Sequence, residues 1–132
     1  MSEIQRYGND ATGQGGKALP FSTAVRAGDF IYISGQVAFN EGGVLEYGDI
    51  EIQTRVTMDN VVKALKLADC NLEDVIKINV WLDDPRDFWG FNKIYATYFT
   101  PGKFPARSCV RSEIMIDAKI EIDAIAYKPL RK

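Results

Sequence analysis

Alternating apolar and polar residues predict a β-strand in the middle of the chain, over residues 74–84 (DVIKINVWLDD). One face of this strand would carry Ile76, Ile78, Val80 and Leu82. The opposite face would carry Lys77, Asn79 and Trp81. The same kind of pattern predicts four further strands, over residues 21–25, 29–37, 105–114 and 118–127.

Apolar residues at helical spacing predict a first helix over residues 51–68. Its buried stripe would consist of Met58, Val61, Val62, Leu65 and Ala68. Asp49 is a suitable N-cap, because its side chain can accept a hydrogen bond from a free backbone N–H in the first turn.

A second helix is predicted to begin at Asp84 and Pro85. Asp84 would cap it, and Pro85 fits the first turn because the N–H that proline lacks would have no helical partner there. Its stripe is aromatic and consists of Phe88, Phe91, Tyr95, Tyr98 and Phe99. The helix would end at Thr100-Pro101-Gly102.

The predicted order is therefore strand–strand–helix–strand–helix–strand–strand. This order is typical of an α+β fold in which two helices cover one face of a mixed sheet. The length of 132 residues fits one domain, 1–132. We expect residues 9–20 to form a Gly-rich loop and the last two strands to form a hairpin around Ile116 and Asp117.

The sheet face away from the helices would carry apolar groups, such as Trp81, Ile125 and Tyr127, among polar ones. An uncovered and partly apolar face indicates an oligomer. We therefore expect a site in a cleft between subunits.

Composition narrows the possible functions. The net charge of −2 and the pI of about 5.1 give no basic surface for nucleic acid. No apolar run is long enough to cross a membrane, and the first residues lack the pattern of a signal peptide, so we expect a cytoplasmic protein. The chain has no histidine, which excludes Ser-His and Cys-His catalysis and imidazole metal sites. Cys70 and Cys109 are expected to be free thiols.

Arg107 and Glu121 are the candidates for chemistry. Strand alternation suggests that both lie on the non-helix face of neighbouring strands. A guanidinium binds a carboxylate through a planar two-pronged contact, and a nearby carboxylate can orient or deprotonate a water. The alternative is an ordinary salt bridge between two strands.

Several motifs in order resemble the Rid family (reactive intermediate deaminases, also called YjgF or L-PSP). The most specific are FPARSCV (104–110) and KIEIDAIA (119–126). IYISGQV (31–37), the helix QTRVTMDNVVKAL (53–65) and the stretch 74–99 resemble the family as well. The resemblance thus covers nearly the whole chain.

The resemblance implies a chorismate-mutase-like α+β fold, with a six-stranded mixed sheet and two helices on one face. It implies a homotrimer with three clefts between subunits. The implied reaction is the hydrolysis of reactive 2-enamino and 2-imino acids, such as 2-aminoacrylate, to 2-keto acids and ammonia. It implies no cofactor and no metal. Some relatives are labelled ribonucleases or translation inhibitors, but the acidic pI, the absence of histidine and the lack of a basic stripe argue against nucleic acid as a partner here. No membrane partner is expected.

The resemblance also assigns roles to single residues. Arg107 matches the arginine that holds the substrate carboxylate, and Glu121 matches the glutamate that hydrogen-bonds the attacking water. Cys109 matches a cysteine whose backbone contacts the site, while its thiol need not be a nucleophile. The other matches to the substrate pocket are Ser34, Gly35 and Asn92. Their structural alternatives are a strand-end turn for the first two and a structural amide for the third.

Two departures from the family pattern bear on the function. Phe21 replaces the tyrosine of many deaminating members at the substrate pocket, so any hydrogen bond from that hydroxyl is absent. The segment after Cys109 is about one residue short, lacks the usual Leu-Pro and carries Arg111. Arg111 suggests as an alternative a dicarboxylate substrate such as 2-aminomuconate. Phe21 leaves open a trimer that binds small carboxylates without turning them over.

Overall fold

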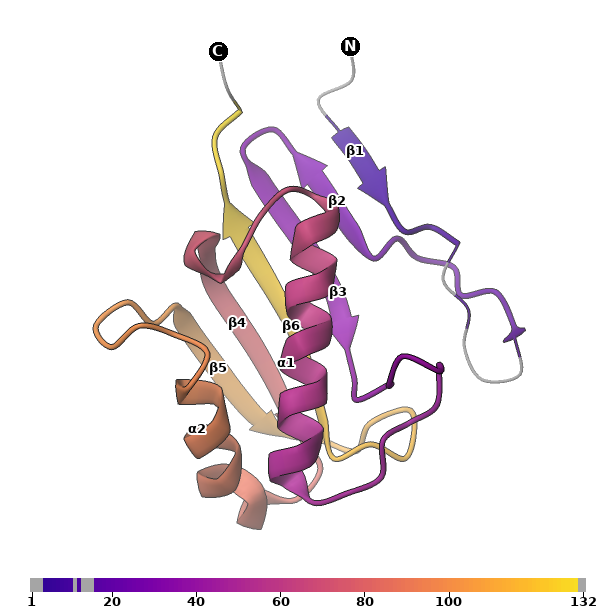
Figure 1. Cartoon of the computed structure of the whole chain (residues 1–132), viewed down its shortest axis with the longest axis vertical. Coiled ribbons are helices and arrows are strands. Elements are labelled where there is room, and N and C mark those ends of the chain that lie inside the picture. The colour runs from indigo at the N-terminus through magenta and orange to yellow at the C-terminus, as the bar shows by residue number, and fades with distance from the viewer. Residues whose placement is uncertain (1–3, 11, 13–15, 131–132) are drawn as a thin grey trace.

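The computed structural model describes residues 4–10, 12 and 16–130, which build a six-stranded sheet and two α-helices (Figure 1). The strands are β1 (Ile4–Tyr7), β2 (Ala24–Ala27), β3 (Phe30–Gln36), β4 (Val75–Leu82), β5 (Ala106–Arg111) and β6 (Ile120–Tyr127). The helices are α1 (Ile50–Leu67) and α2 (Phe88–Ala96), with short 3-10 turns η2 (Leu72–Asp74) and η3 (Pro85–Asp87). The α+β class and the mixed six-stranded sheet are confirmed.

The strands lie in the order β1-β2-β3-β6-β4-β5. β4 and β5 are parallel and are joined through η3 and α2, while the other neighbouring strands are antiparallel. The predicted hairpin of β5 and β6 is wrong, because β6 lies between β3 and β4. A helical connection permits the parallel pairing of β4 with β5, and this leaves β5 at the edge.

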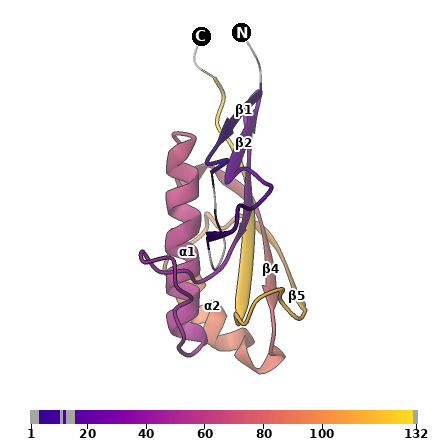
Figure 2. The same cartoon turned by 90° about the vertical axis from the view of Figure 1, so that its right-hand side faces the viewer.

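Both helices cover the same face of the sheet, as the edge-on view shows (Figure 2). Asp49 caps α1 by accepting a hydrogen bond from the Ile52 backbone N–H at 3.0 Å, as predicted. Asp84 caps η3 in the same way, and α2 follows only from Phe88. The helix-side residues of β3, β4 and β6 pack with α1 into one core, whose fully buried members include Ile31, Ile78, Ile122, Met58 and Leu65.

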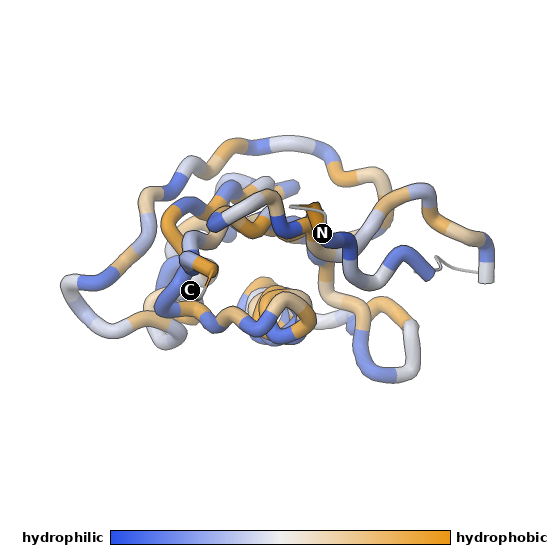
Figure 3. The backbone as a smooth tube through the Cα atoms, turned by 90° about the horizontal axis from the view of Figure 1, so that it is seen from above, coloured by the Kyte–Doolittle hydropathy of each residue, from blue (hydrophilic) through white to orange (hydrophobic). Residues whose placement is uncertain are grey.

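The face of the sheet away from the helices is uncovered (Figures 2 and 3). Apolar side chains on this face are partly exposed, among them Tyr32 on β3 and Tyr127 on β6. Ile76 was expected in the core but is exposed, because a register shift between Val75 and Lys77 interrupts the alternation of β4.

Strand β1 was not predicted from the sequence. Its four residues, IQRY, are largely exposed and show no burial alternation, so they carry no periodic signal. Part of the predicted loop over 9–20 lies outside the described residues; within the described part, Thr12 and Ala18 form an isolated bridge. No helix in the described ranges is long and apolar enough to span a membrane.

Candidate active site

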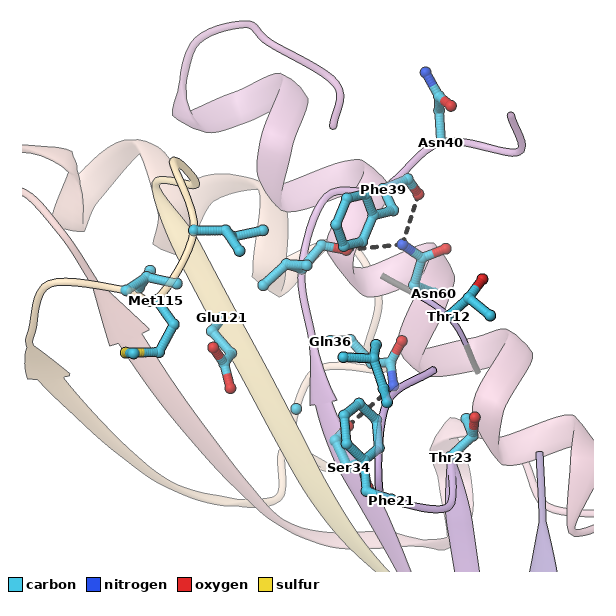
Figure 4. Close-up of a pocket in the computed structure, with 15 residues that line it drawn as sticks. Thr12, Phe21, Thr23, Ser34, Gln36, Phe39, Asn40, Asn60, Met115 and Glu121 are labelled. Atoms are coloured by element: carbon cyan, nitrogen blue, oxygen red, sulfur yellow. Dashed lines mark hydrogen bonds between the residues drawn. The ribbon is translucent and has the colours of Figure 1, made fainter. Parts of the chain in front are cut away.

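A cavity of about 640 Å³ lies beside the end of β3, and four of the predicted site residues line it (Figure 4). These residues are Phe21, Ser34, Gly35 and Glu121. They come from the segment before β2, from β3 and from β6, so the central position of β6 is what brings Glu121 to the cavity. We call this space the Glu121 cavity.

The end of β3 is shaped so that the Glu121 side chain can lie against its backbone. The pairing of β3 with β6 shifts register between Ile33 and Gln36, and Ser34 and Gly35 lie within this irregularity. The Ser34 hydroxyl donates a hydrogen bond of 2.6 Å to the Ser22 carbonyl, which ties β3 to the segment before β2. The carboxylate of Glu121 occupies the space where a side chain on Gly35 would begin.

Gly35→Ala is expected to lower kcat for the imine hydrolysis that the resemblance implies about tenfold. The reason is that displacing a reacting group, here the Glu121 carboxylate, by a fraction of an ångström slows a reaction considerably. A Cβ at Gly35 would collide with Glu121 Oε2 and displace the carboxylate. Gly35 does not have a positive φ, so available space, and not backbone conformation, requires a glycine here. Steady-state kinetics would measure the effect. The control is Gly42→Ala, where the nearest atom, Asn40 Oδ1, is at 3.4 Å; an equal loss there would contradict the argument.

Burial raises the pKa of Glu121 above its usual value, and the negative charge of Asp123 on the same strand raises it further. A carboxyl group with a raised pKa holds a proton more readily, which suits a group that takes a proton from water and then gives it back.

The same shift predicts a pH-dependent contribution to stability. Because the pKa of Glu121 is higher in the folded state, its favourable contribution is complete below the usual pKa and is lost as the pH rises through the folded-state pKa. Glu121→Gln removes this loss. We therefore expect the variant's thermal midpoint, relative to wild type at equal protein concentration, to rise from pH 4 to pH 8. A difference that stays constant over this range would contradict the burial of the charge.

Arg107 does not line the Glu121 cavity but lies on the helix-covered face of the sheet, next to α2. Its Nη1 donates a hydrogen bond of 2.8 Å to Asn92 Oδ1, so these two predicted residues do meet. The guanidinium carbon lies 5.0 Å from the ring centroid of Tyr95, 5.1 Å from that of Phe91 and 5.8 Å from that of Phe88. The faces of aromatic rings attract a cation, but because the rings carry no net charge they do not neutralise it. Arg107 takes part in none of the ion pairs among the described residues.

Arg107 also lines a small cavity of about 260 Å³ together with Asn92, Tyr95 and Phe104. Its guanidinium is thus fixed in direction and carries a charge that the described residues leave uncompensated. Burial raises the pKa of Tyr95 to about 12, with the charge of Arg107 acting in the opposite direction, so that hydroxyl stays protonated. An arginine held in this way is suited to bind an anion from outside the chain.

Cys109 follows on the same face of β5 and packs against the core. Both cysteines are free thiols, as predicted. Burial raises the pKa of the Cys109 thiol, although the charge of Arg107 acts to lower it. A thiol with a raised pKa is a poor nucleophile, which agrees with a backbone role.

Arg111 lines a different cavity from Arg107, of about 370 Å³, together with Cys109 and Trp89.

Arg107 and Glu121 do not share a face of the sheet, so that prediction is wrong. Arg107 pairs with Ile78, which is fully buried under the helices, whereas Glu121 pairs with Trp81 on the open side. The guanidinium of Arg107 lies instead on the helix-covered face, where the aromatic side chains of α2 surround it. β4 also separates the two strands. One chain therefore carries two separate parts of the predicted site.

Sequence reasoning missed the residues that hold Arg107. Phe88, Phe91 and Tyr95 were recognised as part of one aromatic helical stripe, but the stripe was not connected with Arg107. Their spacing of three and four residues places the rings on one side of α2, next to the strand that follows it. An arginine soon after such an aromatic stripe was the signal available.

Comparisons with known proteins place this chain and its fold in a family. The model of the family described as endoribonuclease L-PSP matches residues 15–128. The chain therefore belongs to the L-PSP family, also named Rid, which confirms the resemblance of the motifs.

Individual relatives support the same assignment. A RutC family protein of Pyrococcus horikoshii is 44% identical over 111 residues, which cover 83% of this chain and 87% of that protein. The mouse 2-iminobutanoate/2-iminopropanoate deaminase is 36% identical over 130 residues, covering 97% and 96%. The crystal structure of E. coli TdcF with bound serine has a TM-score of 0.80 and 30% identity, and covers 93% of this chain and 97% of that one.

Proposed function

We propose that this protein hydrolyses reactive 2-imino acids, and the 2-enamino acids that tautomerise to them, to 2-keto acids and ammonia. The observation that carries the proposal is the fixed and uncompensated guanidinium of Arg107, which suits a substrate carboxylate. The mouse relative named as an imine deaminase and the E. coli relative with bound serine support a small substrate of this kind. A cytoplasmic location stays a prediction from the sequence.

We further propose that each site forms between two subunits of a homotrimer. Arg107 and Asn92 of one subunit would face the Glu121 cavity of the next. Two observations support this: the two groups of residues lie on opposite sides of the sheet within one chain, and the open face is partly apolar. A contact between two different surfaces, repeated around a three-fold axis, closes into a ring.

The proposed reaction needs no group beyond water and these side chains. Arg107 binds the carboxylate and fixes the position of the C=N carbon. Glu121 accepts a proton from a water as the water oxygen adds to that carbon, and the proton passes to the nitrogen. Glu121 then accepts the hydroxyl proton of the tetrahedral intermediate and passes it to the nitrogen as the C–N bond breaks, so that ammonia leaves and the C=O bond of the keto acid forms. An imine is already activated, so positioning and these two proton transfers suffice.

The direct test is keto-acid formation from 2-aminoacrylate generated in solution. We expect the wild-type protein to accelerate it and Arg107→Ala not to do so. Equal rates with both proteins would contradict the proposal. Binding of pyruvate without any acceleration would instead favour the non-catalytic alternative that Phe21 leaves open.

A shared site predicts that two inactive variants restore each other. Arg107→Ala still supplies Glu121, and Glu121→Gln still supplies Arg107, so every mixed trimer contains one complete site. Equal amounts, unfolded and refolded together, should regain about a quarter of the wild-type activity if subunits assort at random. Activity that stays at the level of the separate variants would place both residues in one subunit. Mixing without refolding is the control.

A further inference from the structure

A separate cavity of about 290 Å³ lies at the end of the sheet where β4 and β5 begin. One side of it comes from η2 and the other from the segment between α2 and β5. The residues that line it are Leu72, Glu73, Tyr98, Phe99, Thr100 and Lys103. None of these six residues lines the Glu121 cavity or the cavity of Arg107. We call this space the Lys103 cavity.

Two opposite charges line the Lys103 cavity without pairing with each other. Lys103 and Glu73 are both exposed, and neither takes part in an ion pair within the described ranges. Their side chains also form no hydrogen bond with another described residue. An ammonium and a carboxylate that line one space are complementary to a zwitterion, in which the two opposite charges lie close together.

The other side chains of the cavity supply an apolar surface and a fixed polar group. Leu72 and Phe99 are half-buried and pack against the main core. The Tyr98 hydroxyl donates a hydrogen bond of 2.8 Å to Asp59 Oδ1, which holds its ring against α1. Burial raises the pKa of Tyr98, and the hydrogen bond to Asp59 raises it further, so the hydroxyl stays protonated. The cavity therefore combines a rigid apolar surface with two free charges.

We propose that the Lys103 cavity binds an α-amino acid with an apolar side chain. Lys103 would bind the carboxylate, Glu73 the ammonium, and Leu72 and Phe99 would contact the side chain. The volume of about 290 Å³ lies at the lower end of the range for ligand cavities, so it suits one amino acid and not a nucleotide or a peptide. Binding of this kind is independent of the proposed hydrolysis.

The Lys103 cavity shares a wall with the cavity of Arg107. Residues 98–100 and Lys103 line the first cavity, and the next two residues along the chain, Phe104 and Pro105, line the second. The ring centroid of Phe99 lies 4.9 Å from that of Tyr95 and 6.0 Å from that of Phe104, and both of these rings line the Arg107 cavity.

An amino acid that packs on Phe99 would restrict the rings that support both cavities. An anion at Arg107 then meets a wall that is already ordered, so we expect each ligand to strengthen the binding of the other. This coupling, unlike the binding itself, rests on the proposed role of Arg107 as the contact for a carboxylate.

The first test locates the bound ligand by a heteronuclear NMR titration with L-leucine. We expect the backbone amide signals of Glu73, Thr100 and Lys103 to shift, both in the wild type and in Arg107→Ala. The Arg107 variant is needed because the carboxylate of leucine could also bind that guanidinium. Shifts that are confined to the surroundings of Arg107 and disappear in Arg107→Ala would overturn the proposal.

Two analogues and three variants test the charge contacts. Because an ion contact at an exposed site contributes up to about fivefold in affinity, 4-methylpentanoate and 3-methylbutylamine, which each lack one charge, should bind about fivefold more weakly than leucine. Lys103→Gln and Glu73→Gln should each weaken leucine binding about fivefold, and the double variant about 25-fold. Lys66→Gln, at an exposed lysine of α1 outside the cavity, should leave it unchanged. Equal affinity in all these proteins would overturn the site.

Calorimetry of pyruvate tests the coupling. Saturating L-leucine should tighten pyruvate binding about fivefold in the wild type and leave it unchanged in the double variant, and pyruvate should tighten leucine binding by the same factor. Weaker pyruvate binding would mean that leucine competes at Arg107, and unchanged binding would overturn the coupling. If leucine binds in the Lys103 cavity but pyruvate does not bind at all, the amino-acid site stands and the proposed carboxylate contact of Arg107 fails.

Discussion

Arg107→Ala is expected to lower kcat/KM for imine hydrolysis about 100-fold or more. A hydrogen bond to a charged group contributes about 1.5–3 kcal/mol, and removing one partner of a desolvated charge pair costs about 2–5 kcal/mol. The guanidinium is held by Asn92 and by three aromatic rings. Among the described residues that line its cavity there is no other lysine or arginine to take its place. The measurement is steady-state kinetics with 2-aminoacrylate, together with calorimetry of pyruvate binding.

Arg107→Lys tests the shape of this contact separately from its charge. A lysine keeps the charge but loses the planar pair of donors and the hydrogen bond to Asn92 in its present geometry, so we expect most of the activity to be lost. Arg111→Ala is the matched control, because Arg111 lies on the same strand and face but lines a different cavity. Full activity of Arg107→Lys, or an equal loss in Arg111→Ala, would refute a specific carboxylate contact.

Glu121→Gln is expected to lower kcat about 100-fold while pyruvate binding stays close to that of the wild type. A positioned general base contributes typically about 10²–10⁴-fold, and glutamine fills the same space next to Gly35 without being able to accept the proton. The separation of kcat from binding is what assigns Glu121 to the water and not to the substrate carboxylate. A variant that loses binding and kcat in equal measure would contradict this role.

Asp123→Asn is the matched control for Glu121. Asp123 follows on the same face of β6, and its Oδ1 accepts a hydrogen bond of 2.9 Å from the Asn79 amide. Its charge raises the pKa of Glu121. We therefore expect Asp123→Asn to remain active at neutral pH and to shift the acid limb of the kcat profile to lower pH. An unchanged acid limb would indicate that another group titrates there.

The sequence predicted the elements of this fold better than their arrangement. Asp49 identifies the start of α1 almost to the residue, because capping is a local property. The stripe correctly predicts the buried Met58, Val61 and Leu65, but helical spacing of apolar residues misses the polar residues that the helix buries nearer its start, Gln53, Thr54 and Thr57. The neighbours of β6 depend on contacts between distant segments, which no local pattern records. Its alternation of buried and half-buried residues fits an edge strand or a central one equally well.

For the candidate site too, the residues were predicted better than their arrangement. The motifs that contain Arg107 and Asn92 identified two residues that do form a hydrogen bond, and Ser34, Gly35 and Glu121 do line one cavity. Alternation along β5 correctly grouped Arg107 with Cys109 but could not say which face of the sheet they occupy. That choice depends on the rings of α2, whose ability to hold a cation is not visible in a hydropathy pattern.

The central place of β6 has a consequence for the order in which the chain can fold. Until residues 120–127 leave the ribosome, β1-β2-β3 and β4-β5 can form only two separate pieces of sheet, and the edges of β3 and β4 that β6 later covers remain unpaired. Strands with free edges invite pairing with other chains. Nascent or truncated chains that stop before Ile120 should therefore aggregate, whatever the stability of the finished protein. Synthesis of β6 is the step that joins the two pieces into one sheet.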